Sequence, residues 1–118
     1  MGSPVLHWQI VSKDPAATAK FYGKLFEWRI DAANALGYRE VKTGNPQGID
    51  GGIWPCPPEG HSLVQLFMEV PDVDTCVRQA TALGATVIVP KSDLPDGDSM
   101  AVLLDPTGIA FGVYRRRA

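Results

Sequence analysis

The stretch HWQIVSKD at residues 7–14 aligns with QLFMEVPD at residues 65–72, at an offset of 58 residues. Each copy has a strand-like pattern that ends in an aspartate, and a helical pattern follows. The ends of the two halves also correspond, because GIDGGIW at 48–54 aligns with GIAFGVY at 108–114 at an offset of 60. A long repeat present twice predicts two copies of one supersecondary unit that share a core. A pocket is expected where the copies meet.

Length and composition fit one globular domain. A chain of 118 residues is a single domain by size, and each half would be marginally stable alone. The hydrophobic fraction of 45% and charged fraction of 20% are ordinary for globular proteins. A net charge of −2 does not indicate the basic surface that is typical of nucleic-acid binding. No apolar window is long enough to span a membrane. We therefore expect neither nucleic acid nor membrane as a partner.

The cysteines and the first residues bear on location. Cys56 and Cys76 have no spacing typical of a metal or redox motif. The opening MGSPVLHW has neither the basic nor the apolar segment of a signal peptide. A cytoplasmic protein with free thiols is the expectation.

Each half is predicted to run strand, helix and three strands. Asp14 and Pro15 suit a helix start as N-cap and first helical residue, and Phe21, Leu25 and Phe26 keep a helical spacing that predicts packing under the sheet. The proline-rich segment 54–60 is expected to be a hinge, 90–99 a long polar loop, and 105–108 (DPTG) a hairpin turn. The predicted strands cover residues 5–11, 28–32, 38–43, 51–54, 63–70, 86–89, 100–104 and 110–115, and the helices 15–25 and 73–83.

Three stretches carry a family resemblance: LHWQIVSKDPAATAKFYGKLFEW at 6–28, VPDVDTCVRQATALGATVIVP at 70–90 and DPTGIAFGVY at 105–114. Together they resemble the vicinal oxygen chelate superfamily of glyoxalases, bleomycin-resistance proteins and extradiol dioxygenases. GGIWPCPP at 51–58 is similar to a glyoxalase-like subgroup of uncertain function. The resemblance implies an α+β fold in one domain, 1–118. Its two paired βαβββ modules, about 4–56 and 61–116, would form a cupped mixed sheet with the helices outside.

The resemblance also implies where a metal would bind. Metal enzymes of the superfamily place ligands on the first and last strands of each module, and the first-strand positions here are His7 and Gln65. The last-strand carboxylate, seven residues after the aspartate of the DPxG turn, falls on Gly112, whose repeat partner is Gly52. Glycine has no donor side chain, and hard divalent cations prefer anionic oxygen. We therefore expect neither the family metal site nor another cofactor.

A displaced metal site is the alternative. It would use His7 and Gln65 with Glu40 or Glu69, although four residues of strand separate Gln65 from Glu69 by about 13 Å. Such a site would make the chain a metal-dependent lyase, isomerase or dioxygenase. Solvated strand carboxylates are the competing interpretation, and the sequence leaves open whether the chain is an enzyme.

The candidate ligand pocket follows from strand parity. His7, Gln9, Gln65, Phe67 and Tyr114 are expected to converge on the cup. Gly52 and Gly112 would open its floor, either for an organic ligand or for a side chain of the opposite module. Two amides, an imidazole, a phenol and an aromatic ring suit a small polar or planar compound. A packed, internally hydrogen-bonded cluster is the competing interpretation.

These observations favour a glyoxalase-fold protein that binds a small organic molecule without metal. The metal-dependent enzyme is the second hypothesis, and a structural or interaction module with a filled cup is the third. A homodimer is expected in all three cases, since superfamily members of this size usually pair and sheet edges need covering.

Overall fold

The computed structural model describes residues 2–32 and 38–117 and has two compact units. One unit is His7–Gln65, and the other contains the first residues together with the chain from Leu66 onward. The boundary falls inside strands β1 (Val5–Ser12) and β5 (Leu63–Glu69). The predicted division into modules 4–56 and 61–116 stays a prediction.

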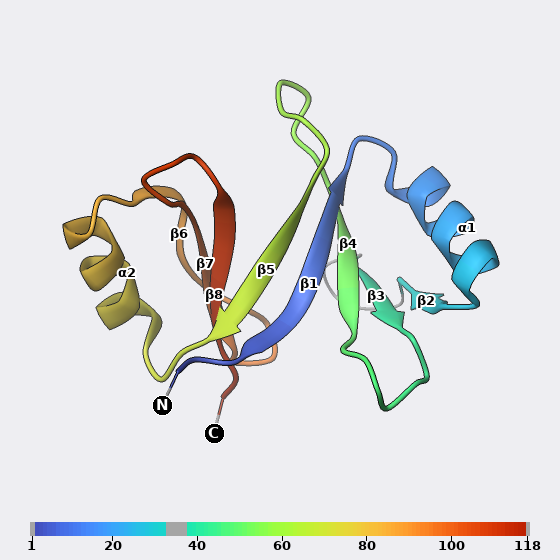
Figure 1. Cartoon of the computed structure of the whole chain (residues 1–118), viewed down its shortest axis with the longest axis horizontal. Helices are drawn as coiled ribbons and strands as arrows, with labels where there is room; N and C mark the ends of the chain where they lie inside the picture. The colour runs from blue at the N-terminus through green and yellow to red at the C-terminus, as the bar shows by residue number, and fades with distance from the viewer. Residues whose placement is uncertain (1, 33–37, 118) are drawn as a thin grey trace. The chain divides into compact units, whose positions relative to one another are not determined.

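The first unit is a mixed four-stranded sheet with one helix. Its strand order is β2-β3-β4-β1, and β1 and β4 are parallel while the other pairs are antiparallel (Figure 1). After β1 the chain forms α1 (Pro15–Phe26), β2 (Arg29–Asp31), β3 (Arg39–Lys42) and β4 (Gly51–Pro55).

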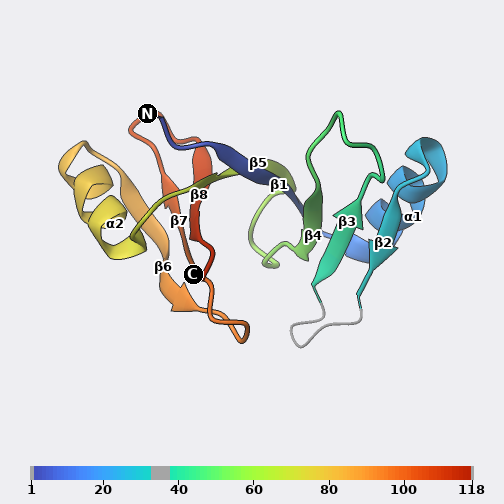
Figure 2. The ribbon, with the colours of Figure 1, turned by 90° about the horizontal axis from the view of Figure 1, so that it is seen from below.

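The second unit repeats this plan. Its order is β5-β8-β7-β6, again with a parallel pair of first and last strands, and α2 lies to one side of β6, β7 and β8 (Figure 2). After β5 come α2 (Val73–Ala82), β6 (Thr86–Asp93), β7 (Ser99–Leu104) and β8 (Ala110–Arg115). The predicted α+β fold of two βαβββ modules is confirmed. The longer helix has 12 residues, and neither described helix is long and apolar enough to cross a membrane.

The repeat extends to the helix caps. The carboxylate of Asp14 accepts a hydrogen bond from the Ala17 N–H at 3.1 Å, and that of Asp72 accepts one from the Thr75 N–H at 3.1 Å. Each aspartate satisfies a backbone donor that a first helical turn leaves without a partner. The two helix starts predicted from the sequence are therefore confirmed together with their cause.

The core of the second unit lies between α2 and its sheet. Leu103 and Ala101 on β7 are 0% exposed, and Val113 on β8 and Val73 on α2 are also buried. Cys76 packs against this cluster, and burial raises the pKa of its thiol. The sequence interpretation of Cys76 as a packing residue agrees with this position.

The predicted inner face of α1 is wrong. Phe21 and Leu25 are each 58% exposed and Phe26 is 51% exposed. The half-buried side chains of α1 lie on a different side of the helix from Phe21, Leu25 and Phe26. On that side the Thr18 hydroxyl lies 2.6 Å from the Ser12 hydroxyl, and Tyr22 stacks on Trp28. Small and polar residues thus contact the sheet, while larger apolar ones face outward.

The predicted loop 90–99 is also wrong in its first part. β6 continues through Asp93, and its pairing with β7 shifts register between Val87 and Val89 and again between Val89 and Ser92. These irregularities accommodate Pro90 on an edge strand, where a missing N–H costs little. The turn at 105–108 is confirmed: the Gly108 N–H bonds the Asp105 carbonyl at 3.0 Å, and Gly108 has a φ of 95°.

Candidate functional site

The two glycines of the predicted pocket, Gly52 and Gly112, lie under aromatic rings of their own units. Gly112 pairs in register with Phe67, and a Cβ atom added to Gly112 would overlap the Phe67 ring. A Cβ atom added to Gly52 would overlap the phenol of Tyr38 in the same way. In each unit we call the sheet face that carries this glycine, Gly52 in the first unit and Gly112 in the second, the glycine face of that unit. The expectation that these glycines open a floor is corrected, because rings of the same module, not the opposite one, fill the space.

Each ring has a second aromatic neighbour, and the two pairs are related by the repeat. Tyr38 lies 5.6 Å from Trp54 between ring centroids, tilted by 47°. Phe67 lies 6.4 Å from Tyr114 in an edge-to-face arrangement of 77°. Trp54 and Tyr114 each follow the covered glycine by two residues, so they project from the same face of their strand. Each unit therefore has an aromatic pair on its glycine face.

Sequence reasoning did not include Tyr38 among the site residues. Burial, together with the charge of Glu40, raises the pKa of its phenol above the ordinary value of 10.0, so the hydroxyl keeps its proton at neutral pH. The available signal was parity, since Tyr38 precedes Glu40 by two residues and Glu40 pairs with Gly52.

The first-strand donors are neutral. Burial lowers the pKa of His7 below 6.5, which favours the uncharged imidazole. Gln65 is 8% exposed, and its side-chain oxygen has no hydrogen-bond partner among the described residues. Within the described chain, no three His, Cys, Asp or Glu side chains are grouped so that they could hold a metal. One imidazole, one amide and two ring-covered glycines do not fit a divalent cation, which needs more ligands and anionic oxygen.

Glu69, a candidate for the displaced metal site, has a different partner. Arg116 donates to both of its carboxylate oxygens, from Nε at 2.5 Å and from Nη2 at 2.9 Å. This hydrogen-bonded ion pair lowers the pKa of the Glu69 carboxyl. The Arg116 side chain is 61% exposed, so this is an ion pair at the surface. The signal was again parity, because Arg116 continues the alternation of Tyr114, which pairs with Glu69.

Asp98 is a further polar residue of the second unit that the sequence analysis did not single out. The Tyr114 hydroxyl donates to Asp98 Oδ2 at 2.7 Å, and the Arg117 N–H donates to Oδ1 at 2.7 Å. Although burial acts to raise the pKa of Asp98, these hydrogen bonds lower it overall. Asp98 thus holds the Tyr114 side chain and the end of the chain in one place.

The structure brings together only part of the predicted pocket. In the second unit Phe67, Gly112 and Tyr114 are neighbours, and in the first unit Gln9 pairs with Gly52. Whether all seven predicted residues build one ligand site stays a prediction. They are His7, Gln9, Gln65, Phe67, Gly52, Gly112 and Tyr114.

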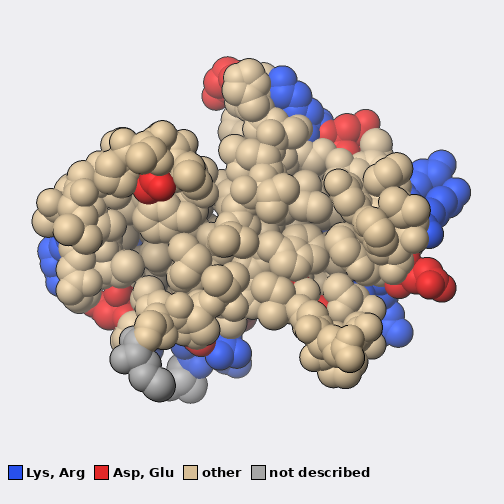
Figure 3. Space-filling view, viewed as in Figure 1, with Lys and Arg blue, Asp and Glu red and all other residues tan. Residues whose placement is uncertain are grey.

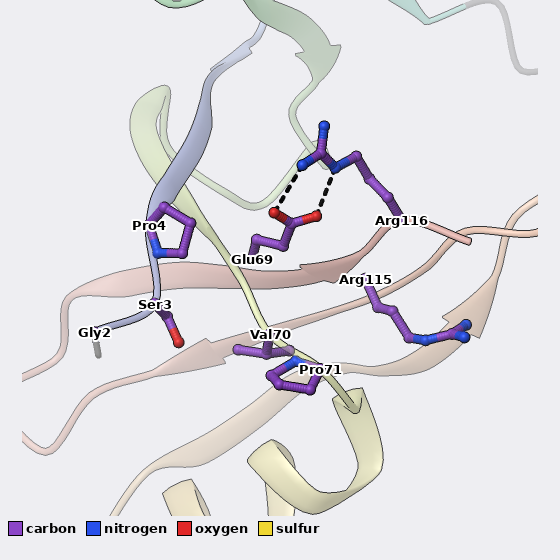
Figure 4. A pocket seen from close by; sticks show the side chains of 8 residues that line it. All are labelled: Gly2, Ser3, Pro4, Glu69, Val70, Pro71, Arg115 and Arg116. Atoms are coloured by element: carbon purple, nitrogen blue, oxygen red, sulfur yellow. Dashed lines mark hydrogen bonds and ion pairs between the residues drawn. The ribbon is translucent and has the colours of Figure 1, made fainter. Parts of the chain in front are cut away.

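Two surface cavities lie elsewhere. One of about 520 Å³ lies on the outer side of α1, around Phe21 and Leu25. Another of about 460 Å³ lies where β5 and β8 end (Figure 4). None of the seven predicted pocket residues lines either cavity. Lys and Arg side chains are interspersed with Asp and Glu on the surface in Figure 3, so that surface has no continuous basic patch for nucleic acid.

Comparison with known proteins decides the family. The family model for the Glyoxalase-like domain matches residues 8–114. This chain belongs to the glyoxalase-like domain family. The glyoxalase-like chain is 31% identical over 122 residues to a protein named putative glyoxylase CFP32 from Mycobacterium bovis, and equally to its Mycobacterium tuberculosis counterpart. The match covers 97% of this chain but 46% of the relative, so the chain spans about half the length of these curated relatives.

Solved structures support the same fold for the glyoxalase-like chain. A hypothetical protein BH1468 from Bacillus halodurans superposes with a TM-score of 0.71 at 9% identity, covering 100% of this chain and 97% of that one. A methylmalonyl-CoA epimerase from Streptomyces coelicolor has a TM-score of 0.63 at 16% identity, covering 98% and 99%. At these identities the likeness concerns the fold alone.

Proposed function

We propose that this glyoxalase-like chain binds a small organic molecule on its glycine face without the metal of the superfamily's enzymes. The observation that carries the proposal is the placement of Phe67 over Gly112 and of Tyr38 over Gly52. At both repeat-related positions a ring occupies the space in which a ligating carboxylate would begin. Chemistry that depends on a cation held by those carboxylates has no support from these residues.

The ligand class follows from the groups on this face. Aromatic pairs favour a planar or ring-containing compound, because ring edges and faces attract one another beyond their buried area. Gln9, Gln65 and His7 would supply hydrogen bonds that orient such a compound. The unpartnered oxygen of Gln65 is best satisfied by a ligand N–H or O–H group, because leaving it buried and unpaired is costly.

Metal titration is the first test. Protein purified without chelator would be titrated calorimetrically with Mn²⁺, Ni²⁺, Zn²⁺ and Fe²⁺, alongside a His7→Ala variant. We expect no saturable binding to either protein. Stoichiometric binding that His7→Ala abolishes would overturn the proposal and favour a metal-dependent lyase, isomerase or dioxygenase.

A ligand screen is the second test. Small heteroaromatic compounds would be screened by NMR, with the side-chain signals of Trp54 and Tyr114 as reporters. We expect saturable binding that Gln65→Leu weakens about tenfold, which corresponds to the loss of one buried hydrogen bond. The matched control is Gln79→Leu on the exposed side of α2, which should leave binding unchanged. Equal loss in both variants would contradict the assignment of Gln65.

Assembly and location belong to the same proposal. The curated relatives are about twice as long as this chain, since the match covers 46% of their length. Such a relative has room for a second domain of this size, and a homodimer would supply the equivalent from a second chain. We propose a homodimer in the cytoplasm, in keeping with the free thiols of Cys56 and Cys76.

A further inference from the structure

A cavity of about 460 Å³ lies within the second unit, and neither ring of that unit's aromatic pair lines it (Figure 4). Three segments form it: the chain before β1, the end of β5 with the residues that lead into α2, and the end of β8. This volume is in the range of small-molecule sites. Its lining residues are Gly2, Ser3, Pro4, Glu69, Val70, Pro71, Arg115 and Arg116.

The walls of this cavity are apolar and fixed by backbone hydrogen bonds. Pro4, Val70 and Pro71 supply the apolar surface. The Glu69 N–H donates to the Pro4 carbonyl at 2.9 Å, and the Val70 N–H donates to the Tyr114 carbonyl at 2.9 Å. These two amides are therefore already used, and Pro4 and Pro71 have no N–H to offer. The backbone at these four residues therefore offers no free N–H, and the charged groups of the lining are side chains.

The charges in the cavity do not balance. Arg116 and Glu69 form a two-bond ion pair, at 2.5 and 2.9 Å, and so neutralise each other. Arg115 is half-buried and makes no ion pair with a carboxylate of the described residues. Figure 4 shows its side chain extending away from the Arg116–Glu69 pair. One positive charge is left, on a planar group whose N–H fork matches a carboxylate.

We propose that this cavity binds a small monoanionic carboxylate with a short apolar body. The Arg115 guanidinium donates two hydrogen bonds to the carboxylate, and the body lies against Pro4, Val70 and Pro71. A single uncompensated cation favours one negative charge, and the proline walls favour an aliphatic chain over a fully hydrated anion. None of the seven residues of the predicted pocket lines this cavity, so the proposal does not depend on the function proposed for the glycine face.

Amide chemical shifts in NMR spectra test the proposal, with sodium butyrate as the probe at constant ionic strength. We expect saturable shifts at Glu69, Val70 and Arg116. Arg115→Gln should weaken binding about tenfold, the loss of a charge-assisted hydrogen bond. Arg117→Gln removes the same charge two residues further along the chain and should leave the affinity within about twofold. Glu69→Gln releases Arg116 and should tighten binding a few-fold.

Several outcomes would overturn the proposal. They are linear, unsaturable shifts, equal losses in Arg115→Gln and Arg117→Gln, and weaker binding in Glu69→Gln. Saturation by inorganic phosphate but not by butyrate would overturn the carboxylate assignment. Arg115→Lys keeps the charge without the planar fork and gives the same comparison if Arg115→Gln does not fold; it should bind several-fold more weakly than the parent protein.

Discussion

Gly112 lies at the strand position for which the family resemblance implies a metal-binding carboxylate, and Phe67 covers this glycine. The two residues face each other on parallel strands, so the ring of Phe67 uses the space that a larger partner would take. Gly52 and Tyr38 form the equivalent arrangement in the first unit. In both units the glycine has no side chain, and the aromatic ring fills the space that a side chain would take.

A substitution measures this packing. Gly112→Ala should lower the free energy of unfolding by about 1–3 kcal/mol, because the added methyl group forces the buried Phe67 ring to move. Urea denaturation followed by circular dichroism gives the value. Phe67→Leu should reduce the penalty of Gly112→Ala in a double-mutant cycle, since a smaller neighbour leaves room.

Gly48 provides the matched control. A Cβ atom added there would meet no atom within 4 Å, so Gly48→Ala should change stability by about 0.5 kcal/mol or less. If Gly112→Ala were as neutral as Gly48→Ala, the ring would not occupy the position that we describe.

Asp98 gives a pH-dependent prediction. Its pKa is lowered below 3.8 in the folded chain, despite burial, by hydrogen bonds from the Arg117 N–H and the Tyr114 hydroxyl. A depressed carboxyl pKa stabilises the fold above the unfolded value, and this contribution is lost as pH falls through the folded value. Stability should therefore decline below about pH 4, and Asp98→Asn should flatten part of that decline.

Denaturant titrations between pH 2 and pH 7 measure this effect. Asp96→Asn is the control, because it removes a second carboxylate of the same loop, one that accepts a hydrogen bond from the Asp98 N–H and not from Tyr114 or Arg117. Identical pH profiles for Asp98→Asn and the parent protein would contradict the role of Asp98.

At the scale of elements, the two helices bury very different surfaces. α2 contributes Val73 to the core and packs Cys76 against it, whereas α1 has no fully buried residue. α1 is attached by a hydroxyl pair, Ser12 with Thr18, and by the stacking of Tyr22 on Trp28. Phe21 and Leu25 do follow a helical spacing, but their side chains lie on the outer, exposed side of α1.

Substituting one leucine in the core under α2 and one on the outer side of α1 compares the stability that each contributes. Leu103→Ala should cost about 2–5 kcal/mol, because Leu103 is 0% exposed between β7 and α2. Leu25→Ala removes the same atoms from a residue that is 58% exposed and should cost about 0.5 kcal/mol or less. Thermal or urea unfolding compares them directly. A large loss for Leu25→Ala would show that the outer side of α1 is covered in solution.

β6 shows how an edge strand is managed. It ends the order β5-β8-β7-β6 and carries Ile88 at 52% exposure, a surface that invites pairing with another strand. Two register shifts interrupt its pairing with β7, Pro90 lies within the second of them, and Lys91 forms an ion pair with Asp74 of α2. Bulges, proline and charge are the usual means by which exposed edges resist aggregation.

At the scale of the whole molecule, the internal repeat and the length of the relatives bear on assembly. We expect a homodimer, with twice the chain mass of 12.7 kDa in sedimentation equilibrium. The expectation rests on the usual pairing of small superfamily members and on relatives of which this chain covers 46%. A monomer mass that persists across a hundredfold range of concentration would contradict it.

The sequence predicted the fold because the fold depends on local and repeated signals. Asp14 and Asp72 specify helix starts through their own side chains, and strand alternation and the turn that ends in Gly108 are equally local. Two copies of the same pattern predicted the plan of strand, helix and three strands in each half, whereas the order of strands in each unit came from the structure. The sequence also singled out the glycines at 52 and 112, and the structure places an aromatic ring over each of them.

Only the tertiary structure decided what occupies the glycine face and which side of α1 points inward. Phe67 covers Gly112 and Arg116 bonds Glu69 across paired strands. Which residues meet in this way depends on the register of the strands, and the partners are far apart in the sequence. Apolar spacing gives the width of a helix stripe but not which stripe meets the sheet, so Phe21 was placed on the wrong side. Helix caps need only neighbouring residues, whereas contents of a site depend on contacts between distant ones.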